Sequence, residues 1–375
     1  MCGIDFVSVV VAALGFWVIA YTLLSAIRTV ILPRGEITWL GLIVFRALGF
    51  VFRAMTNSRS TFERRDRVMA LYAPIGLILL PALWVTLVLL GFMLVYFGVG
   101  DYSWEQAFTI SGSSLLTLGF STVDSLGQRV LVFAEATIGL GIVALLITFL
   151  PSIYQAFSRR EALVGLLEVR GGSPPSAEEF LIRNARILGL DRLTDEWSAW
   201  ERWFVEIEES HVSYPALVFF RSPRPSRSWV TAAGTVLDAA GLTIAALDVP
   251  PQPQAALSIR AGYLALRQIA DYFNIPNPVD PQQADPIAIT RAEFEATLDR
   301  LEAEGIPLKA DRDRAWRDFA GWRVNYDACL LGLAQMVVAP RAPWTSDRPP
   351  LAGDDRSRFG RLRRSTNDDL EPTAR

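Results

Sequence analysis

Three long apolar stretches in the first 157 residues constrain this chain more than any other feature of its sequence. They are Ile4–Ile31, Val68–Val99 and Val130–Phe157. Each is long enough to cross the hydrocarbon core of a bilayer, which takes about 20 apolar residues in a helix. The first has no basic leading region and runs on past the length of a signal peptide, so we expect it to be retained. The sequence therefore predicts an all-α, multi-pass membrane protein.

A fourth apolar stretch, residues 37–55, has two open interpretations. It is long enough to form a second transmembrane helix. However, Arg46 and Arg53 lie one heptad apart and therefore share one face of a helix. An arginine face opposite apolar residues is typical of a helix that lies in the membrane interface. Residues 1–66 are thus expected to hold an N-terminal transmembrane helix plus an interfacial or second transmembrane helix.

Arginines indicate which ends of the spans face the cytoplasm. Those beside the second and third long spans are Arg59, Arg64, Arg65, Arg67, Arg159 and Arg160. Cytoplasmic loops carry an excess of basic residues, so both of these ends are expected to be cytoplasmic. We accordingly predict a protein of the cell inner (plasma) membrane, with its C-terminal domain in the cytoplasm.

The segment Trp104–Thr122, between the second and third long spans, combines a short helical pattern with small polar residues. It ends in the run Thr117, Leu118, Gly119, Phe120 and Ser121. Non-helical backbone at membrane depth is tolerated only where protein buries it or where it lines a water-filled path. Glycine at position 119 permits a positive φ, and backbone carbonyls can replace the water shell of a small cation. We interpret residues 67–160 as a pore module: an outer helix, a re-entrant pore loop and an inner helix.

Four residues of the last span are candidates for supporting or gating this loop. They are Glu135, Gly139, Gly141 and Pro151. An acid inside an apolar span is a functional candidate by default, here as a filter-supporting group, a snorkelling carboxylate or an ion site. The two glycines either form a hinge or allow close helix packing. The proline removes a helix hydrogen bond and can bend the helix at the cytoplasmic entrance.

These residues resemble the two-helix pore module of the potassium-channel superfamily, whose usual filter is Thr-Val-Gly-Tyr-Gly. Thr117 and Leu118 match its Thr and Val, and Gly119 matches its first Gly. Phe120 stands in place of its Tyr, and Ser121 in place of its second Gly. The run is also similar to the filters of Trk/Ktr/HKT-type potassium transport proteins, which fuse four pore units in one chain. The resemblance implies a selectivity filter at residues 117–121, K⁺ as the permeant ion and no cofactor.

One pore loop cannot surround an ion, so the resemblance also implies a homotetramer with four-fold symmetry, embedded in membrane lipids. Ser121 departs from the usual pattern, since a non-glycine residue at positive φ costs about 1 kcal/mol or more. Fewer aligned carbonyls weaken the discrimination between K⁺ and Na⁺. A non-selective cation channel therefore stays open as an alternative.

Beyond the last span the sequence changes to a charged, tryptophan-rich pattern. Helices are expected at Ala177–Leu188, Asp195–Glu209, Val230–Ala245, Ala256–Tyr272, Arg291–Ala303 and Ala310–Val338, with one β-like run at Tyr214–Phe220. Residues 161–340 are thus predicted to form a cytoplasmic α-helical domain for regulation or assembly, with an unknown ligand or partner. Residues 341–375 are rich in Pro, Asp, Ser and Arg and are predicted to be a disordered tail.

Composition argues against several other functions. The net charge of −3 does not suggest a nucleic-acid partner, and one histidine with two cysteines gives no His/Cys metal site. No set of nucleophile and base indicates catalysis, so we expect no enzyme and no catalytic residues. His211 is either a pH sensor or a structural histidine, and Arg221, Arg224 and Arg227 either bind an anion or form a solvated loop. The alternative to a channel is a membrane-anchored interaction or scaffold protein with a non-conducting loop.

Overall fold

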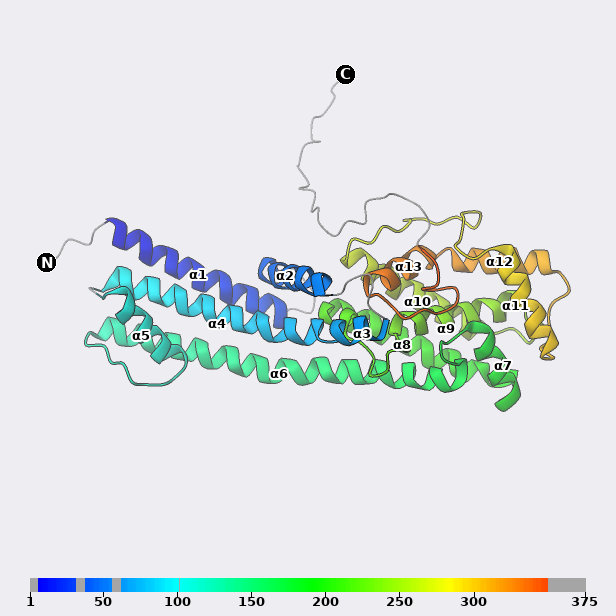
Figure 1. The fold of residues 1–375 in the computed structure, drawn as a ribbon, viewed down its shortest axis with the longest axis horizontal. Helices are drawn as coiled ribbons and strands as arrows, with labels where there is room; N and C mark the ends of the chain where they lie inside the picture. The colour runs from blue at the N-terminus through cyan, green and yellow to red at the C-terminus, as the bar shows by residue number, and fades with distance from the viewer. Residues whose placement is uncertain (1–5, 32–37, 56–61, 101, 350–375) are drawn as a thin grey trace, which may run out of the picture.

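Helices make up the regular structure of the computed structural model, which describes residues 6–31, 38–55, 62–100 and 102–349. Within these ranges there is no β-strand, only an isolated bridge between Leu247 and Leu308. The molecule is elongated, with long parallel helices towards one end and a bundle of shorter helices at the other (Figure 1). The predicted all-α architecture is confirmed.

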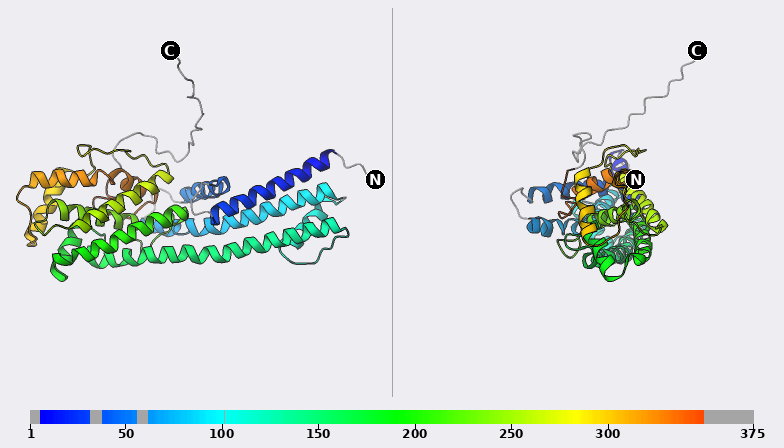
Figure 2. Two further views of the ribbon diagram at one scale, coloured as in Figure 1. Left: turned by 180° about the vertical axis from the view of Figure 1, so that it is seen from behind. Right: turned by 90° about the vertical axis from the view of Figure 1, so that its right-hand side faces the viewer.

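Three helices within the described residues are long and apolar enough to cross a membrane. They are α1 (Phe6–Val30), α4 (Tyr72–Val99, extended at its start by α3) and α6 (Leu126–Gly171). They run side by side along the long axis of the molecule (Figures 1 and 2). A Cβ atom added at Gly15 of α1 would lie 2.5 Å from the carbonyl oxygen of Gly91 in α4. Small residues therefore let the backbones of α1 and α4 approach closely, as is common between membrane helices.

The second long span is divided near its N-terminal end. Helix α3 (Phe62–Met69) ends at a turn, and α4 begins at Tyr72. Pro74 follows in the first turn of α4 and has no N–H group to donate back to the preceding helix, which accounts for the break. Pro81 lies inside α4 without ending it. The residues Pro74 and Pro81 themselves predict a kink or break towards the start of this span, and the structure places the break before Pro74.

Helix α2 (Trp39–Met55) lies across the long helices instead of along them. In the view down the long axis, α1, α4 and α6 are seen close to end-on whereas α2 is seen from the side (Figure 2). Leu40, Val44 and Leu48 are buried in one apolar cluster with residues of α1 and α4. This crossing direction is the one expected of an interfacial helix, and α2 is not among the three candidate spans.

Helix α6 connects the two ends of the molecule. Its 46 residues correspond to about 69 Å, roughly twice the thickness of a bilayer core. It continues without interruption through Gly139, Gly141 and Pro151. The predicted span at 130–157 is therefore only the first part of the helix, and the remainder packs into the helical domain.

The helical domain has one large core around α9 (Trp229–Ala245), which is buried on almost all sides. The surrounding elements are α7 (Ala177–Ile187), η1 (Leu190–Arg192), α8 (Leu193–Ser213), η2 (Pro215–Phe219), α10 (Pro253–Tyr272), α11 (Arg291–Ala303), α12 (Arg312–Arg323) and α13 (Asp327–Met336). The predicted helices between 177 and 303 are confirmed to within a few residues.

Three expectations for this half of the chain were wrong. The β-like run Tyr214–Phe220 forms the 3₁₀ turn η2, because Pro215 removes a donor that a strand needs. The single helix expected at 310–338 is broken between α12 and α13. Residues 341–349 are not a loose tail, since Trp344 packs against Phe319 with ring centroids 5.6 Å apart. Residues 350–375, the rest of the predicted tail, lie outside the described residues.

Candidate functional site

The short helix α5 (Trp104–Leu115) lies between α4 and α6 and begins at a well-formed cap (Figure 1). The backbone N–H of Ser103 donates to the side chain of Gln106 at 2.9 Å, and the Ser103 hydroxyl accepts from the backbone N–H of Gln106. This reciprocal pair is a capping box. The Trp104 ring stacks on Phe97 of α4 with centroids 4.1 Å apart. The start of α5 is thus fixed to the end of α4.

The other end of α5 is closed by a pair of backbone hydrogen bonds. Leu118 N–H donates to the Ser113 carbonyl at 2.8 Å, and Thr117 N–H donates to the Ser114 carbonyl at 3.0 Å. This is the Schellman pattern, in which the residue after the helix takes the left-handed conformation. That residue is Thr117, with φ of 55°. Glycine is usual at such a position, because positive φ costs other L-residues roughly 1–2 kcal/mol.

A second left-handed residue follows at Gly119, with φ of 73°. The prediction of a positive φ at this glycine is confirmed. Ser121, in contrast, is not among the described residues with positive φ, and its N–H donates to the hydroxyl of Ser113 at 3.1 Å. The expected strain at Ser121 was therefore wrong. The strain falls on Thr117, and a β-branched side chain in this region is a genuine outlier.

The loop after α5 is exposed on the single chain. Leu118 is 60% exposed and Phe120 is 66% exposed, and no other atom lies within 4 Å of a Cβ built on Gly119. Ser113 and Ser114, in contrast, are buried behind the loop. The structure therefore holds the predicted filter residues 117–121 from one side and leaves the other side uncovered.

Glu135 of α6 is fully buried behind α5 and is hydrogen-bonded at both carboxyl oxygens. The Tyr96 hydroxyl of α4 donates to Oε2 at 2.9 Å, and Oγ of Ser111 lies 2.5 Å from Oε1. The snorkelling alternative is therefore excluded. Sequence reasoning found the acid because it interrupts an apolar span. It missed Tyr96, since a tyrosine near the end of a span carries no distinguishing signal.

The other inner-helix candidates separate into two groups. A Cβ atom at Gly139 would lie 2.2 Å from the Leu115 carbonyl oxygen, so α6 meets the end of α5 at this glycine. Gly141 and Pro151 face away from α5 and are exposed, with nothing within 4 Å of a Cβ at Gly141. The structure thus brings Glu135 and Gly139 to the loop-bearing helix and leaves the other two apart. A hinge or gate at Gly141 and Pro151 stays a prediction.

Beyond the apolar part of α6, the buried Arg160 joins this helix to the turn η2. Its guanidinium donates to the carbonyl oxygens of Leu217 at 2.8 Å and Phe220 at 2.7 Å. The same turn reaches α4, where the rings of Phe219 and Tyr72 meet edge to face at 5.3 Å. One short segment of the helical domain therefore contacts both α4 and α6.

His211 is a buried structural residue of this junction. Its Nε2 atom lies 3.3 Å from a guanidinium nitrogen of Arg160, and its ring packs on Trp229. Burial, reinforced by the positive charge of Arg160, holds the pKa of His211 well below its ordinary value. The histidine therefore stays neutral at physiological pH, which favours the structural interpretation over the pH sensor.

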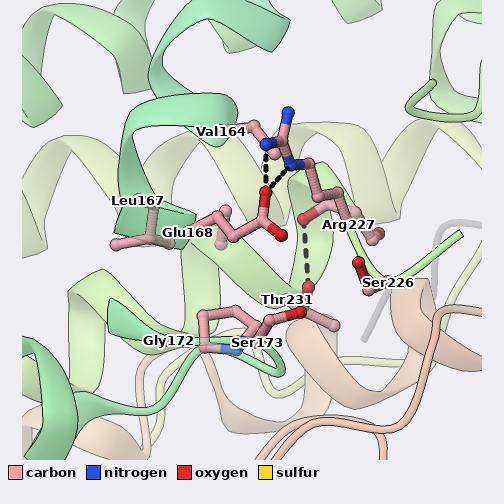
Figure 3. Close-up of a pocket in the computed structure, with 11 residues that line it drawn as sticks. Val164, Leu167, Glu168, Gly172, Ser173, Ser226, Arg227 and Thr231 are labelled. Carbon is pink, nitrogen blue, oxygen red and sulfur yellow. Dashed lines mark hydrogen bonds and ion pairs between the residues drawn. The ribbon is translucent and has the colours of Figure 1, made fainter. Parts of the chain in front are cut away.

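The arginines predicted to bind an anion or form a solvated loop are mostly held by carboxylates of this chain. Arg221 pairs with Asp66 of α3 at 2.6 Å, and Arg227 pairs closely with Glu168 of α6. Arg224 is mostly exposed and also reaches Glu168, at 3.2 Å. Figure 3 shows Glu168 and Arg227 bridging the wall of a small pocket at the end of α6. The pocket's charged groups are thus already paired, and the arrangement does not favour an anion site.

Comparison of this chain with protein families, with curated proteins and with solved structures gives no match. Among the described residues, no group of three or more His, Cys, Asp or Glu side chains is placed to hold a metal ion. The chemistry that this site offers lies in the backbone of the exposed loop at residues 116–121 and in the buried contacts behind it.

Proposed function

We propose that this chain is one subunit of a homotetrameric cation channel of the cell inner membrane, with potassium as the conducted ion. The observation that carries the proposal is the position of α5. This short helix is fixed between two membrane-length helices and ends in an exposed loop with left-handed residues at Thr117 and Gly119. Strained backbone clusters where function requires it, and exposed non-helical backbone at membrane depth is tolerated where it lines a water-filled path.

Electrostatics supports a cation as the permeant species. The C-terminal end of α5 precedes the loop, and the C-terminus of a helix carries partial negative charge. Backbone carbonyls of residues 117–121 would supply the ligands for a dehydrated ion. Selectivity for K⁺ over Na⁺ would depend on how many of these carbonyls align in the assembled filter.

The uncovered faces of the subunit support assembly around an axis. Apolar residues repeat every seven positions along the exposed side of α6, at Phe133, Leu140, Ile147 and Tyr154. Within the membrane this side can meet lipid or another subunit. The exposed loop residues Leu118 and Phe120 would be covered by neighbouring copies, since a single loop cannot encircle an ion. The helical domain would regulate or assemble the channel through its contact with α4 and α6.

Flux from purified protein in liposomes tests the proposal, with K⁺ and Na⁺ supplied separately and in competition. We expect K⁺ flux, with K⁺ reducing Na⁺ flux in the mixture. Native mass spectrometry of the same preparation should give four copies per particle. A correctly inserted protein without cation flux would favour the membrane-anchored scaffold function instead, and a stable dimer would contradict a four-fold pore. Equal flux of both ions would identify a non-selective cation channel.

A further inference from the structure

We propose that Glu135 is a neutral carboxylic acid, and that its proton completes a chain of hydrogen bonds that holds α5 between α4 and α6. In terms of the proposed channel, Glu135 is a positioning residue for the filter, and this part of the inference rests on the proposed function. The protonation state itself rests only on the contacts of Glu135, Ser111, Tyr96 and Leu89.

Counting donors and acceptors leads to the neutral acid. Oγ of Ser111 lies 3.0 Å from the Leu89 carbonyl oxygen and 2.5 Å from Oε1 of Glu135. A hydroxyl has one proton, so Ser111 can donate to only one of these two acceptors. If Oε1 carries a proton, Glu135 donates to Ser111 and Ser111 donates to Leu89. Oε2 then remains free to accept from the Tyr96 hydroxyl, and every contact has one donor and one acceptor.

The surroundings of Glu135 also favour the neutral form. The residue has no exposed surface, and within the described residues no lysine, arginine or histidine forms an ion pair with it. An isolated carboxylate in an apolar environment is far more costly to bury than a hydrogen-bonded neutral group. Acids inside membrane spans are accordingly rare and face the protein interior, as this one does.

The chain of hydrogen bonds begins and ends on α4, which gives it a mechanical role. Leu89 and Tyr96 lie about two helical turns apart on that helix, and the path between them runs through α6 and α5. Ser111 lies one turn before Leu115, whose carbonyl meets Gly139 of α6. Glu135 and Gly139 are also one turn apart. Together they form a continuous contact that fixes the C-terminal half of α5, and therefore the start of the loop.

Substitution by glutamine provides the test, because its amide reproduces the neutral acid. In Glu135→Gln the NH₂ group can donate to Ser111 and the carbonyl oxygen can accept from Tyr96. We expect this variant to keep the thermal midpoint and the K⁺/Na⁺ flux ratio of the wild type. Glu135→Ala should lower the midpoint by several degrees and lose the flux ratio. Glu105→Gln, on the exposed first turn of α5, is the matched control and should change neither.

Infrared spectroscopy of the full-length protein in lipid reads the protonation state directly. The difference spectrum between wild type and Glu135→Gln should show the loss of one protonated carboxyl C=O band. Loss of a carboxylate band instead, or a glutamine variant as unstable as the alanine variant, would overturn the inference. Neither readout needs conduction. If the wild type carries no flux but the protonated carboxyl band is present in the wild type and absent from Glu135→Gln, the inference stands and the proposed channel function fails.

Discussion

The helical domain and the long apolar helices of this molecule differ in how far a single chain buries their apolar residues. The helical domain buries its apolar residues around α9 and in a single core with Trp197, Trp200 and Trp203. In the apolar window of α6, in contrast, only 17% of the residues are buried by the chain itself. A single chain therefore buries the apolar residues of the helical domain but leaves most of the apolar surface of α6 exposed.

The buried polar groups of the two halves differ in the same way. In the domain, Arg323 is surrounded by Asp238 at 2.5 Å and Asp327 at 2.7 Å, an ion-paired network with no exposed surface on the arginine. Behind α5, Glu135 has hydroxyl partners only. The domain is stabilised by internal charge pairing, whereas the α4–α5–α6 unit depends on hydrogen bonds between uncharged groups. The exposed apolar faces of that unit need lipid or another subunit to cover them.

The largest expected effect concerns the charge network of the domain. Arg323→Leu leaves two carboxylates buried without their cation, and breaking a buried pair in this way costs about 3–5 kcal/mol. Unfolding followed by tryptophan fluorescence of the full-length protein should show this loss. Arg314→Leu is the control, because the side chain of Arg314 is 75% exposed. Equal loss in the two variants would contradict a stabilising role for the buried charge network.

A substitution at the contact between α6 and α5 is expected to have the next largest effect on stability. Gly139→Ala places a Cβ atom against the Leu115 carbonyl and forces the helices apart, at a cost of about 1–3 kcal/mol. Gly141→Ala has open space and should be neutral or stabilising by up to about 1 kcal/mol. Thermal unfolding and liposome flux should both separate the two variants. If Gly141→Ala were the damaging one, a hinge would explain the glycines better than packing.

A pH titration should show the neutral histidine at the junction of the halves. The folded-state pKa of His211 is depressed, so at acidic pH the unfolded chain binds a proton that the folded chain does not. Its contribution to stability is complete above about pH 6.5 and should fall by about 1.4 kcal/mol per pH unit below it, until the folded pKa is reached. His211 is the chain's single histidine, so His211→Gln should flatten the slope between about pH 6.5 and 5. An unchanged slope would contradict the assignment.

The smallest expected effect is at the strained turn. Thr117→Gly relieves the positive φ and should stabilise the fold by at most about 1 kcal/mol, since glycine also gains freedom in the unfolded chain. Because this substitution removes a threonine side chain from the proposed filter, flux should change more than stability does. Thr109→Gly, at a half-buried position in the middle of α5, should instead destabilise by about 1 kcal/mol. Equal effects of the two substitutions on unfolding would argue against strain at Thr117.

Sequence patterns predicted the elements whose cause is local. The apolar lengths gave the three long helices, the break fell beside Pro74, and Gly119 took the positive φ that its residue type allows. Glu135 stood out because an acid in an apolar span is costly. Features set by distant contacts were missed or wrong, since no local pattern encodes them. The helix expected at 310–338 broke where Arg323, at the end of α12, turns inward to pair with Asp238 and Asp327.

The same contrast explains the site. The sequence indicated a loop between spans and the residue types within it. It could not show that Ser111 and Tyr96 meet Glu135, because these three residues come from separate helices and each is ordinary in its own segment. Nor could it show that Ser121 keeps an ordinary φ while Thr117 is strained, since that exchange follows from the two backbone hydrogen bonds that close α5.

Current recorded from the reconstituted protein in planar bilayers tests the central claim most directly, with wild type and Gly119→Pro compared. Proline fixes φ near −65°, so it cannot adopt the φ of 73° that residue 119 has in this loop. The account predicts K⁺ current from the wild type, none from Gly119→Pro, and wild-type current from the control Gly127→Ala at an open position. A silent wild type, or a Gly119→Pro channel that conducts normally, would contradict a filter at residues 117–121.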